Sequence, residues 1–231
     1  MEDGKATEKV NENTGWSGTV RTGVAGFHTW FGTRSANVVM GALLYPLWVV
    51  GLSRTIPALA WYLHPLALLI AVVTWDLSSG FIHWTFDELS QDNPVLGHLA
   101  KTFQLHHTKP QLFLEWSVWE NCKYDHLAAL PLMGGALLLP ISPLALEAAV
   151  FYTLFGAFSE WFHAFGHGAH RKNPIVRKLS AVGILLSTKH HGQHHAWPHK
   201  KNYCIFNGMC DPILNRFAML LRYVRGITPD A

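Results

Sequence analysis

Long uncharged apolar stretches occupy the middle of the chain. Segments 36–53 and 56–75 carry no charge, and 127–162 carries only Glu147 and Glu160. About 20 mostly apolar residues can cross a bilayer as a helix. Pro140 and Pro143 interrupt the third stretch, because proline lacks an amide donor and clashes with the preceding helical turn. The pattern predicts four spans, at 36–53, 56–75, 127–141 and 144–162. The third is short, so a re-entrant hairpin is an alternative. Buried core helices of a soluble protein rarely run so long without a polar face.

Basic residues fall on one side of this predicted arrangement. With four crossings, the N-terminal segment, the 76–126 loop and the region after residue 162 share a side. All 18 Lys and Arg residues except Arg54 then lie there, which is the asymmetry of the positive-inside rule. We expect an all-α, multi-pass integral membrane protein with both termini and a histidine-rich cap on the cytoplasmic side.

The N-terminal segment 1–35 differs in composition from the rest. It is polar and expected to be partly disordered, whereas 36–231 should form one domain. It has acidic residues and no early apolar run, so no signal or transit peptide is expected. The 3 cysteines include no CxxC pair, which gives no sign of a disulfide framework. The net charge of +3 favours anionic lipid headgroups or an acidic protein as partners, with no sign of nucleic-acid binding.

Most of the 15 histidines fall into groups at or just beyond the cytoplasmic ends of the predicted spans. The groups are His83 with Asp87; His106 with His107; His163, His167 and His170; and His190, His191, His194 and His195. The first group shares one helical face with Asp76 and Gly80. Within the third and fourth groups, histidines recur at i, i+4 spacing.

The i, i+4 spacing places two imidazoles about one turn apart, close enough to hold one metal ion. These groups offer more ligands than the three or four that one zinc ion needs, which favours a two-metal site with open positions for oxygen and substrate. Imidazole and carboxylate suit iron, zinc, copper or nickel, so the ligands leave the metal open. A site at the membrane edge implies a lipid substrate. The other histidines are expected at the surface or hydrogen-bonded in the core: His28, His64, His98, His126 and His199.

The ordered motifs, from about Asp76 to Arg222, resemble one family: the plasmanylethanolamine desaturases, the related Kua proteins and the plant chloroplast desaturase that acts on phosphatidylglycerol palmitate. The motifs are D-x3-G-x2-H-W-x2-D at 76–87, H-H-x2-P at 106–110, E-N-C at 120–122, H-x3-H at 163–167, H-H-x2-H-H at 190–195 and Y-C-x3-G at 203–208. Glu120 stands where Asp is commoner, and Asp211 stands where Asn is expected. These departures put the exact lipid in doubt.

The resemblance implies a non-haem di-iron membrane enzyme. It would use O2 and two external electrons to place a double bond near the headgroup end of a phospholipid chain. The implied iron ligands are His83, Asp87, His106, His107, His163, His167, His190, His191, His194 and His195. His190 is the least secure, because the broader H-x2-H-H pattern needs only the last three of its motif. Asp76, Asn121, Glu160 and His170 are expected to support the ligands. For Glu160 the alternative is a pairing with a neighbouring span.

Electrons must come from a partner, because no G-x-G-x2-G or CxxCH motif suggests that the chain binds its own nicotinamide, flavin or c-type haem. A cytochrome b5-like protein or a ferredoxin is expected. Basic residues beside the histidines would dock this donor or contact lipid headgroups: Arg171, Lys172, Lys200 and Lys201.

Several functions remain open at this point. A plasmanylethanolamine that becomes a plasmalogen is the first choice of substrate, and an acyl phosphatidylglycerol is the second. A lipid hydroxylase could use the same oxidant. A haem- or metal-binding membrane protein is the rival from another class, although only His64 lies within a predicted span.

Overall fold

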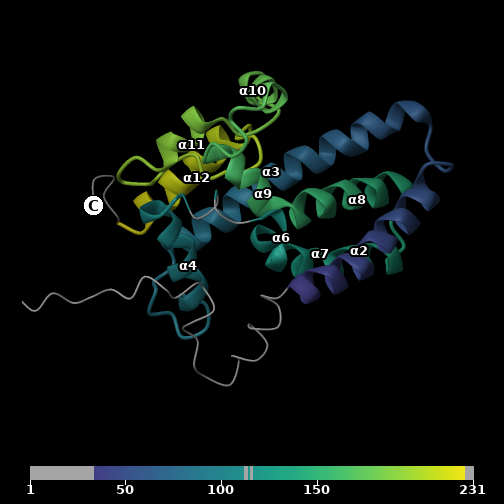
Figure 1. Cartoon of the computed structure of the whole chain (residues 1–231), viewed down its shortest axis with the longest axis horizontal. Coiled ribbons are helices and arrows are strands. Elements are labelled where there is room, and N and C mark those ends of the chain that lie inside the picture. Colours follow the sequence, from purple (N-terminus) through teal and green to yellow (C-terminus); the bar gives the residue numbers. More distant parts are fainter. Residues whose placement is uncertain (1–33, 112–113, 115–116, 227–231) are drawn as a thin grey trace, which may run out of the picture.

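The computed structural model describes residues 34–111, 114 and 117–226, and every regular element in these residues is a helix (Figure 1). The all-α prediction is therefore confirmed there, while residues 1–33 of the predicted polar segment lie outside the described residues. The elements in chain order are α2 (Arg34–Thr55), the 3₁₀ helix η1 (Trp61–Leu63), α3 (His64–Glu88), α4 (Gly97–Thr108), α6 (Val118–Asn121), α7 (Lys123–Leu138), α8 (Pro143–Ala157), α9 (Ser159–Gly166), α10 (Pro174–Ala181), α11 (Thr188–His194) and α12 (Asp211–Val224).

Helix α8 is the centre of an apolar bundle. It packs against α2, α3 and α7, and Figure 1 shows these helices side by side. Leu44 of α2, Met133 of α7 and Val150 of α8 are fully or almost fully buried in one core cluster. The indole N–H of Trp48 donates to Thr153 Oγ1 at 3.0 Å, which satisfies both polar groups inside that cluster. Long apolar helices therefore form one body from which the polar cap extends.

Two helical segments within the described residues are long and apolar enough to cross a membrane, Val38–Thr55 and Trp61–Glu88. Only 33% of the apolar stretch in each is buried, and side chains such as Leu43, Val49 and Leu69 face outward. Apolar side chains turned outward along a whole helix suit a lipid environment. Helices α7, with 16 residues, and α8, with 15, are apolar but shorter. Membrane association is thus supported, and the prediction of four crossings stays a prediction.

The helix bounds differ from the expected spans in two places. The second span was expected to start at residue 56, but α3 starts at His64, with Pro65 in its first turn, and continues to Glu88. The fourth, expected over 144–162, is divided at Phe158 into α8 and α9. At this break the Glu160 amide donates to Asp125 Oδ2 at 3.0 Å, so a side chain of α7 fixes the new direction of the chain.

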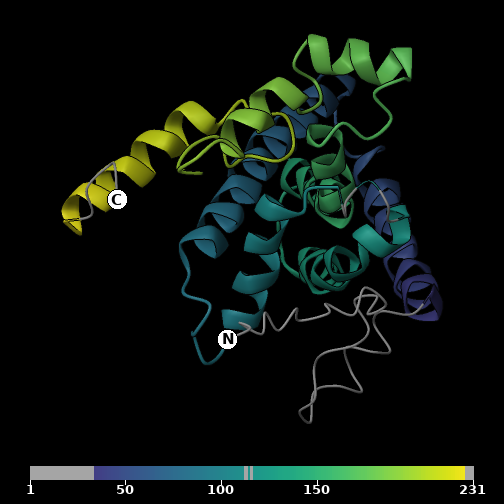
Figure 2. The ribbon, with the colours of Figure 1, turned by 60° about the vertical axis from the view of Figure 1, so that its left-hand side comes forward.

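The C-terminal half of α3 carries the cap. Helix α4 packs against α3, α11 against α9, and α12 against α3 (Figure 2). A Cβ at Gly80 would lie 2.6 Å from Cys204 Sγ and 3.1 Å from the Cys204 Cα, so only glycine allows the 203–210 loop to lie this close to α3. Asp76 fixes that loop: its Oδ1 accepts the amides of Asn207 and Gly208 at 3.0 Å, and its Oδ2 accepts the amide of Cys210 at 2.8 Å.

Candidate metal centre

Two groups of histidines converge where α3, α4, α9 and α11 meet. In each group the potential ligand atoms all lie within 4.8 Å of one another. His106 belongs to both groups, so the two lie side by side. The first group is His106, His163, His167, His191 and His195, and the second is His83, His106, His107 and His194.

In the first group, four ring nitrogens face a common point. The His163 Nε2 lies 3.0 Å from His191 Nε2 and 3.2 Å from His167 Nε2. The His191 Nε2 is 3.1 Å from both His167 Nε2 and His195 Nε2. One N–H serves one acceptor, so hydrogen bonds cannot satisfy all these contacts, and facing lone pairs repel. Two imidazole nitrogens bound at about 2.1 Å and at a right angle to one ion lie about 3.0 Å apart. The observed spacing therefore fits a shared metal ion.

In the second group, the Asp87 carboxylate lies among the ring nitrogens. Its Oδ1 is 3.0 Å from His107 Nε2, and its Oδ2 is 3.5 Å from His83 Nε2 and 3.4 Å from His194 Nε2. The His83 Nε2, His194 Nε2 and Asp87 Oδ2 atoms are buried and make no hydrogen bond to the described residues. Buried polar atoms are normally paired. Three such atoms aimed at one another, one of them anionic, fit a cation between them.

The other nitrogen of several rings is held by the protein. The Nδ1 of His83 donates to the Tyr203 carbonyl at 3.0 Å, and that of His194 donates to the Lys201 carbonyl at 2.9 Å. His106 Nδ1 donates to the carbonyl of Phe103. Because a carbonyl only accepts, the proton lies on Nδ1 and the Nε2 lone pair points inward. This is the tautomer that a metal-binding histidine needs.

The His163 ring is held by a carboxylate rather than a carbonyl. Its Nδ1 lies 3.1 Å from Glu160 Oε2, one turn earlier in α9. Glu160 therefore sits where a residue that orients a ligand ring would sit, as the sequence suggested. A carboxylate partner also makes the ring a stronger electron donor to a bound cation.

Residues of α4 and α12 fix the end of α3. The Gln104 amide donates to the carbonyls of Phe86, Asp87 and Leu89 at 3.0, 3.2 and 2.9 Å, which caps the last turn of the helix that carries Asp87. Arg222 donates to the Glu88 carboxylate and to the Tyr203 hydroxyl. The same Tyr203 supplies the carbonyl that orients His83, so α12 stabilises the site without reaching into it.

Several histidines of the centre have a lowered pKa and are held in the neutral state. Burial, reinforced by neighbouring imidazoles, lowers the pKa of His167 to about 4 and of His195 to about 2. The pKa values of His106 and His191 are also well below the usual value, first because of burial. Metal binding requires deprotonated imidazole, so these rings are ready to bind a cation at neutral pH.

Some predicted residues lie outside the two groups. The His190 Nε2 donates to Asp211 Oδ2 at 2.6 Å, so the expected i, i+4 pair of His190 with His194 does not form. The predicted stripe from His163 to His170 is wrong at its last member. Helix α9 ends at Gly166, and His170 has a φ of 53° in the following turn. Asp76 anchors the 203–210 loop.

Asn121 and the predicted docking cations are also placed. Asn121 is buried at the end of α6 and, with His170, lines a cavity of about 460 Å³ beside α9. Arg171 and Lys172 lie in the exposed turn after α9, and Lys200 and Lys201 follow α11. The Lys201 carbonyl, rather than its ammonium group, contacts a ligand histidine.

Sequence reasoning missed several supporting residues. His199, expected to be an ordinary surface or core residue, donates to the His194 carbonyl at 3.1 Å, and its ring centroid lies 4.4 Å from that of His107. Its distance from His194 matches no helical repeat, so spacing gave no signal. Tyr203 acts through its carbonyl, which any residue would supply. For Glu88 the only available signal was adjacency to Asp87. Arg222 gave none, because α12 also carries Asp211 and Arg216.

Residues 72–228 match the family model described as the lipid desaturase domain. The chain is 32% identical over 167 residues to the Arabidopsis thaliana chloroplastic fatty acid desaturase 4, covering 69% of this chain and 48% of the relative. It is 34% identical over 175 residues to the Myxococcus xanthus plasmanylethanolamine desaturase, covering 72% of this chain and 59% of the relative. It is 31% identical over 191 residues to the Mus musculus plasmanylethanolamine desaturase 1, covering 74% and 69%.

The chain thus spans about half to three fifths of the length of the plant and bacterial relatives. No solved structure matches. The family match covers α3 from Val72 onward through α12 and so contains every histidine of the two groups. With the motif order, the convergent histidines and these matches in agreement, the chain belongs to the lipid desaturase family.

Proposed function

We propose that this chain is an oxygen-dependent desaturase that places a double bond near the headgroup end of a phospholipid chain, with two iron ions held by the two histidine groups. The convergence of these groups carries the proposal. Buried nitrogens from four helices face two adjacent points, and the outer nitrogens of several rings are fixed by carbonyls or by Glu160. Such preorganisation has no value for a hydrogen-bonded core, because the His83 Nε2, His194 Nε2 and Asp87 Oδ2 atoms are buried without a hydrogen-bond partner among the described residues.

The residues divide into two ligand sets. One ion would be held by His163, His167, His191 and His195, and the other by His83, Asp87, His107 and His194, with His106 between them. When bound, the irons would supply the oxidant for breaking unactivated C–H bonds, which no side chain can provide. The protein orients the rings, keeps His167, His191 and His195 neutral, and surrounds the rings with buried side chains that limit the access of water.

The reaction balances with an outside source of electrons. Removing one hydrogen from each of two adjacent carbons and reducing O2 to two waters takes up two further electrons and two protons. The electron donor would be an acidic cytochrome b5-like protein or a ferredoxin. Lys172, Lys200 and Lys201 lie beside α9 and α11 and would supply a docking charge of opposite sign.

The proposed substrate is a plasmanylethanolamine, whose alkyl ether becomes the vinyl ether of a plasmalogen. Two of the relatives carry the name plasmanylethanolamine desaturase. In the proposed topology, α2, α3 and the α7–α8 hairpin lie in the bilayer and the cap lies on the cytoplasmic side. The histidines, at the cap end of α3, would then meet the top of a lipid chain rather than its middle.

The test is reconstitution with purified protein, iron, O2, a reduced donor and a defined lipid. An ether phospholipid should yield an acid-labile vinyl ether, and His83→Ala, His107→Ala, His167→Ala and His194→Ala should each abolish it while the protein still inserts into membranes. Metal analysis should find about two irons per chain. Full activity in two of these variants would contradict the proposal.

Product analysis separates the alternatives. Mass spectrometry showing a gain of oxygen in the lipid would make the enzyme a hydroxylase. A double bond in an acyl phosphatidylglycerol, with none in the ether lipid, would reverse the order of substrates. A Soret band in place of non-haem iron would favour a haem protein.

A further inference from the structure

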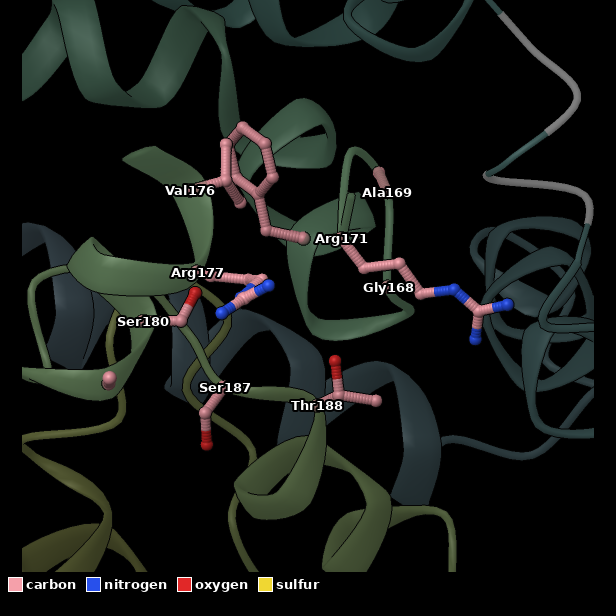
Figure 3. Close-up of a pocket in the computed structure, with 10 residues that line it drawn as sticks. Gly168, Ala169, Arg171, Val176, Arg177, Ser180, Ser187 and Thr188 are labelled. Carbon is pink, nitrogen blue, oxygen red and sulfur yellow. The ribbon is translucent and has the colours of Figure 1, made fainter. Parts of the chain in front are cut away.

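A second cavity, of about 190 Å³, lies beside the metal centre but takes no part in holding it. It is formed by the turn after α9, by α10 and by the start of α11 (Figure 3). Its polar wall includes Arg177, Ser180 and Thr188, and its apolar wall includes Phe165 and Val176. Figure 3 shows the Arg177 guanidinium lying between the side chains of Ser180 and Thr188, whereas the Arg171 guanidinium points away from them.

The sequence around the cavity carries an excess of positive charge. From residue 161 to 210 the sequence has no Asp or Glu, whereas it contains Arg171, Lys172, Arg177, Lys178, Lys189, Lys200 and Lys201. Among the described residues, neither Arg171 nor Arg177 forms an ion pair. An unpaired guanidinium beside two hydroxyls offers several donors, and no carboxylate is present to accept them. The lining therefore suits an anion with several acceptor oxygens.

The chain places this cavity next to the histidines. Gly168, which lines the cavity, directly follows His167, and Thr188 precedes His191 in α11 by one turn. The helices that carry these residues touch at Gly166, where a Cβ would lie 3.0 Å from the ring of His191 and 2.7 Å from Leu186 Cδ2. A group bound in the cavity is thus separated from the first histidine group by one layer of packed residues.

The outer surface beside the cavity is apolar. Ile175 in α10 and Val182 and Ile184 just after it are 67%, 63% and 53% exposed, and α10 stands out from the body of the cap (Figure 1). Arg177 and Lys178 lie on the same short helix. A short amphipathic helix with exposed branched apolar side chains and cations is typical of a segment at the bilayer interface. Lipid headgroups would then lie at the level of the cavity.

We propose that this cavity binds the phosphate of the phospholipid substrate. Arg177 pairs with the phosphate oxygens and the hydroxyls of Ser180 and Thr188 donate to them. The inference rests on the proposed function, since it assigns the headgroup end of that lipid. Arginine presents a planar fork of donors that matches phosphate geometry. Arg171, which the sequence offered for donor docking or for contact with lipid headgroups, also lines this cavity.

Holding the phosphate explains how one site would select carbons close to the glycerol. In a glycerophospholipid, the phosphate and the first carbons of the chain are joined through three glycerol carbons. A fixed phosphate therefore limits which carbons reach the histidines, and fixing a reactant in this way lowers the entropic cost of reaching the reactive geometry. Phe165 and Val176, on the apolar wall, would contact the glycerol and the start of the chain.

The test compares two charge-removing variants of one helix. Arg177→Gln removes the proposed phosphate ligand, and Lys178→Gln removes an equal charge from the next residue, which does not line the cavity. KM is measured for an ether phospholipid, for the same 1-O-alkyl-2-acylglycerol without phosphate, and for the reduced donor. Arg177→Gln should raise KM for the phospholipid on the order of tenfold or more and leave KM for the other two within twofold. Lys178→Gln should leave all three within twofold, and Arg177→Lys should give an intermediate rise.

Binding is measured separately by native mass spectrometry of a short-chain ether phosphoethanolamine on wild-type protein and on Arg177→Gln. If Arg177→Gln retains less lipid than wild type and Lys178→Gln does not, the result supports phosphate binding in the cavity. This holds even if wild-type protein makes no double bond, a result that would contradict only the proposed function. An equal rise in KM for the phosphate-free lipid, or a rise only for the donor, overturns the inference. The inference is also overturned if inorganic phosphate binds to wild-type protein in competition with the lipid while KM for the lipid is unchanged in Arg177→Gln. The cavity would then be a site for free anions.

Discussion

Replacing Glu160 with Gln tests whether the second layer of the metal centre does more than pack. The Glu160 Oε2 lies 3.1 Å from Nδ1 of His163, whose side chain is almost fully buried. A hydrogen bond to a charged group contributes about 1.5–3 kcal/mol and a neutral one about 0.5–1.5 kcal/mol. The amide therefore weakens the contact by about 1–1.5 kcal/mol. A free-energy difference of 1.4 kcal/mol corresponds to a factor of ten in affinity. Iron affinity should therefore fall roughly tenfold, which is at the low end of the loss expected when the hydrogen-bond partner of a metal ligand is replaced.

The matched control is Glu147→Gln. Glu147 is also a buried carboxylate that accepts from a histidine, with His64 Nδ1 2.8 Å from its Oε1 and 2.9 Å from its Oε2. His64 begins α3, and His83 lies 19 positions further along the same helix, roughly 28 Å at the rise of an α-helix. This variant should lower the melting temperature in detergent and leave iron content unchanged.

The assay is iron per chain after dialysis against a graded series of a competing chelator, with thermal melting of the same samples. Glu160→Gln should release iron at roughly tenfold lower chelator concentration, with little change in the melting temperature of the metal-free protein. Release at the wild-type concentration, or equal iron loss in Glu147→Gln, would refute the reasoning and make Glu160 a packing residue.

Three further predictions follow from the contacts around the site. His190→Asn should keep wild-type iron content on metal analysis. Asp211 raises the pKa of His190. The pair therefore stabilises the folded protein fully below the unfolded pKa of about 6.5, and this contribution is lost as pH rises through the folded pKa. The melting-temperature difference between wild type and variant should accordingly shrink from pH 6 to pH 9. Asp76→Asn should lower the melting temperature by leaving the buried Cys210 amide unpaired, at a cost of about 1–3 kcal/mol; an unchanged melting curve would contradict this. Chelation should lower the melting temperature of wild-type protein more than that of His163→Ala, as scanning fluorimetry would show, because metal bound only to the folded state stabilises it.

The sequence predicted which candidate ligands come together best where those residues share one helix. His83 and Asp87 lie on one face of α3, and His191 and His195 lie one turn apart with their Nε2 atoms 3.1 Å from each other. Helical periodicity fixes such pairs before any tertiary contact forms. It failed at His170, because Gly168 has a φ of 90° and ends the repeat after His167.

The sequence could not show which residues hold the rings from outside. The partners of His83, His106 and His194 are backbone carbonyls, which carry no residue signature. The exact ends of the helices could not be predicted from the sequence either. The Phe158 break depends on Asp125 accepting the Glu160 amide from another helix, and no local composition signal predicts a contact of that range.

The cap and the apolar bundle differ in how they are held. The bundle core is Leu44, Met133 and Val150 with their neighbours, and burial of apolar surface accounts for it. The cap has a smaller apolar cluster around Trp84 and Leu214 and adds polar anchors, with Asp76 accepting three amides of the 203–210 loop. A loop anchored by one carboxylate can adopt the shape that two ligand-bearing segments require, which apolar packing alone does not specify.

Asp211 shows why one departure from the family pattern need not concern the lipid. The sequence placed it where Asn is expected, and on that basis the exact lipid was in doubt. In the structure Asp211 is buried, its Oδ1 accepts the Cys204 amide at 2.9 Å, and its Oδ2 accepts from His190 at 2.6 Å. It lines neither of the two cavities beside α9. An Asn could accept through one oxygen only, so the carboxylate joins the 203–210 loop to α11 by two bonds where an amide would make one. Asp211 therefore affects how the cap is attached. We expect the residues that select the lipid to lie in the walls of the cavities.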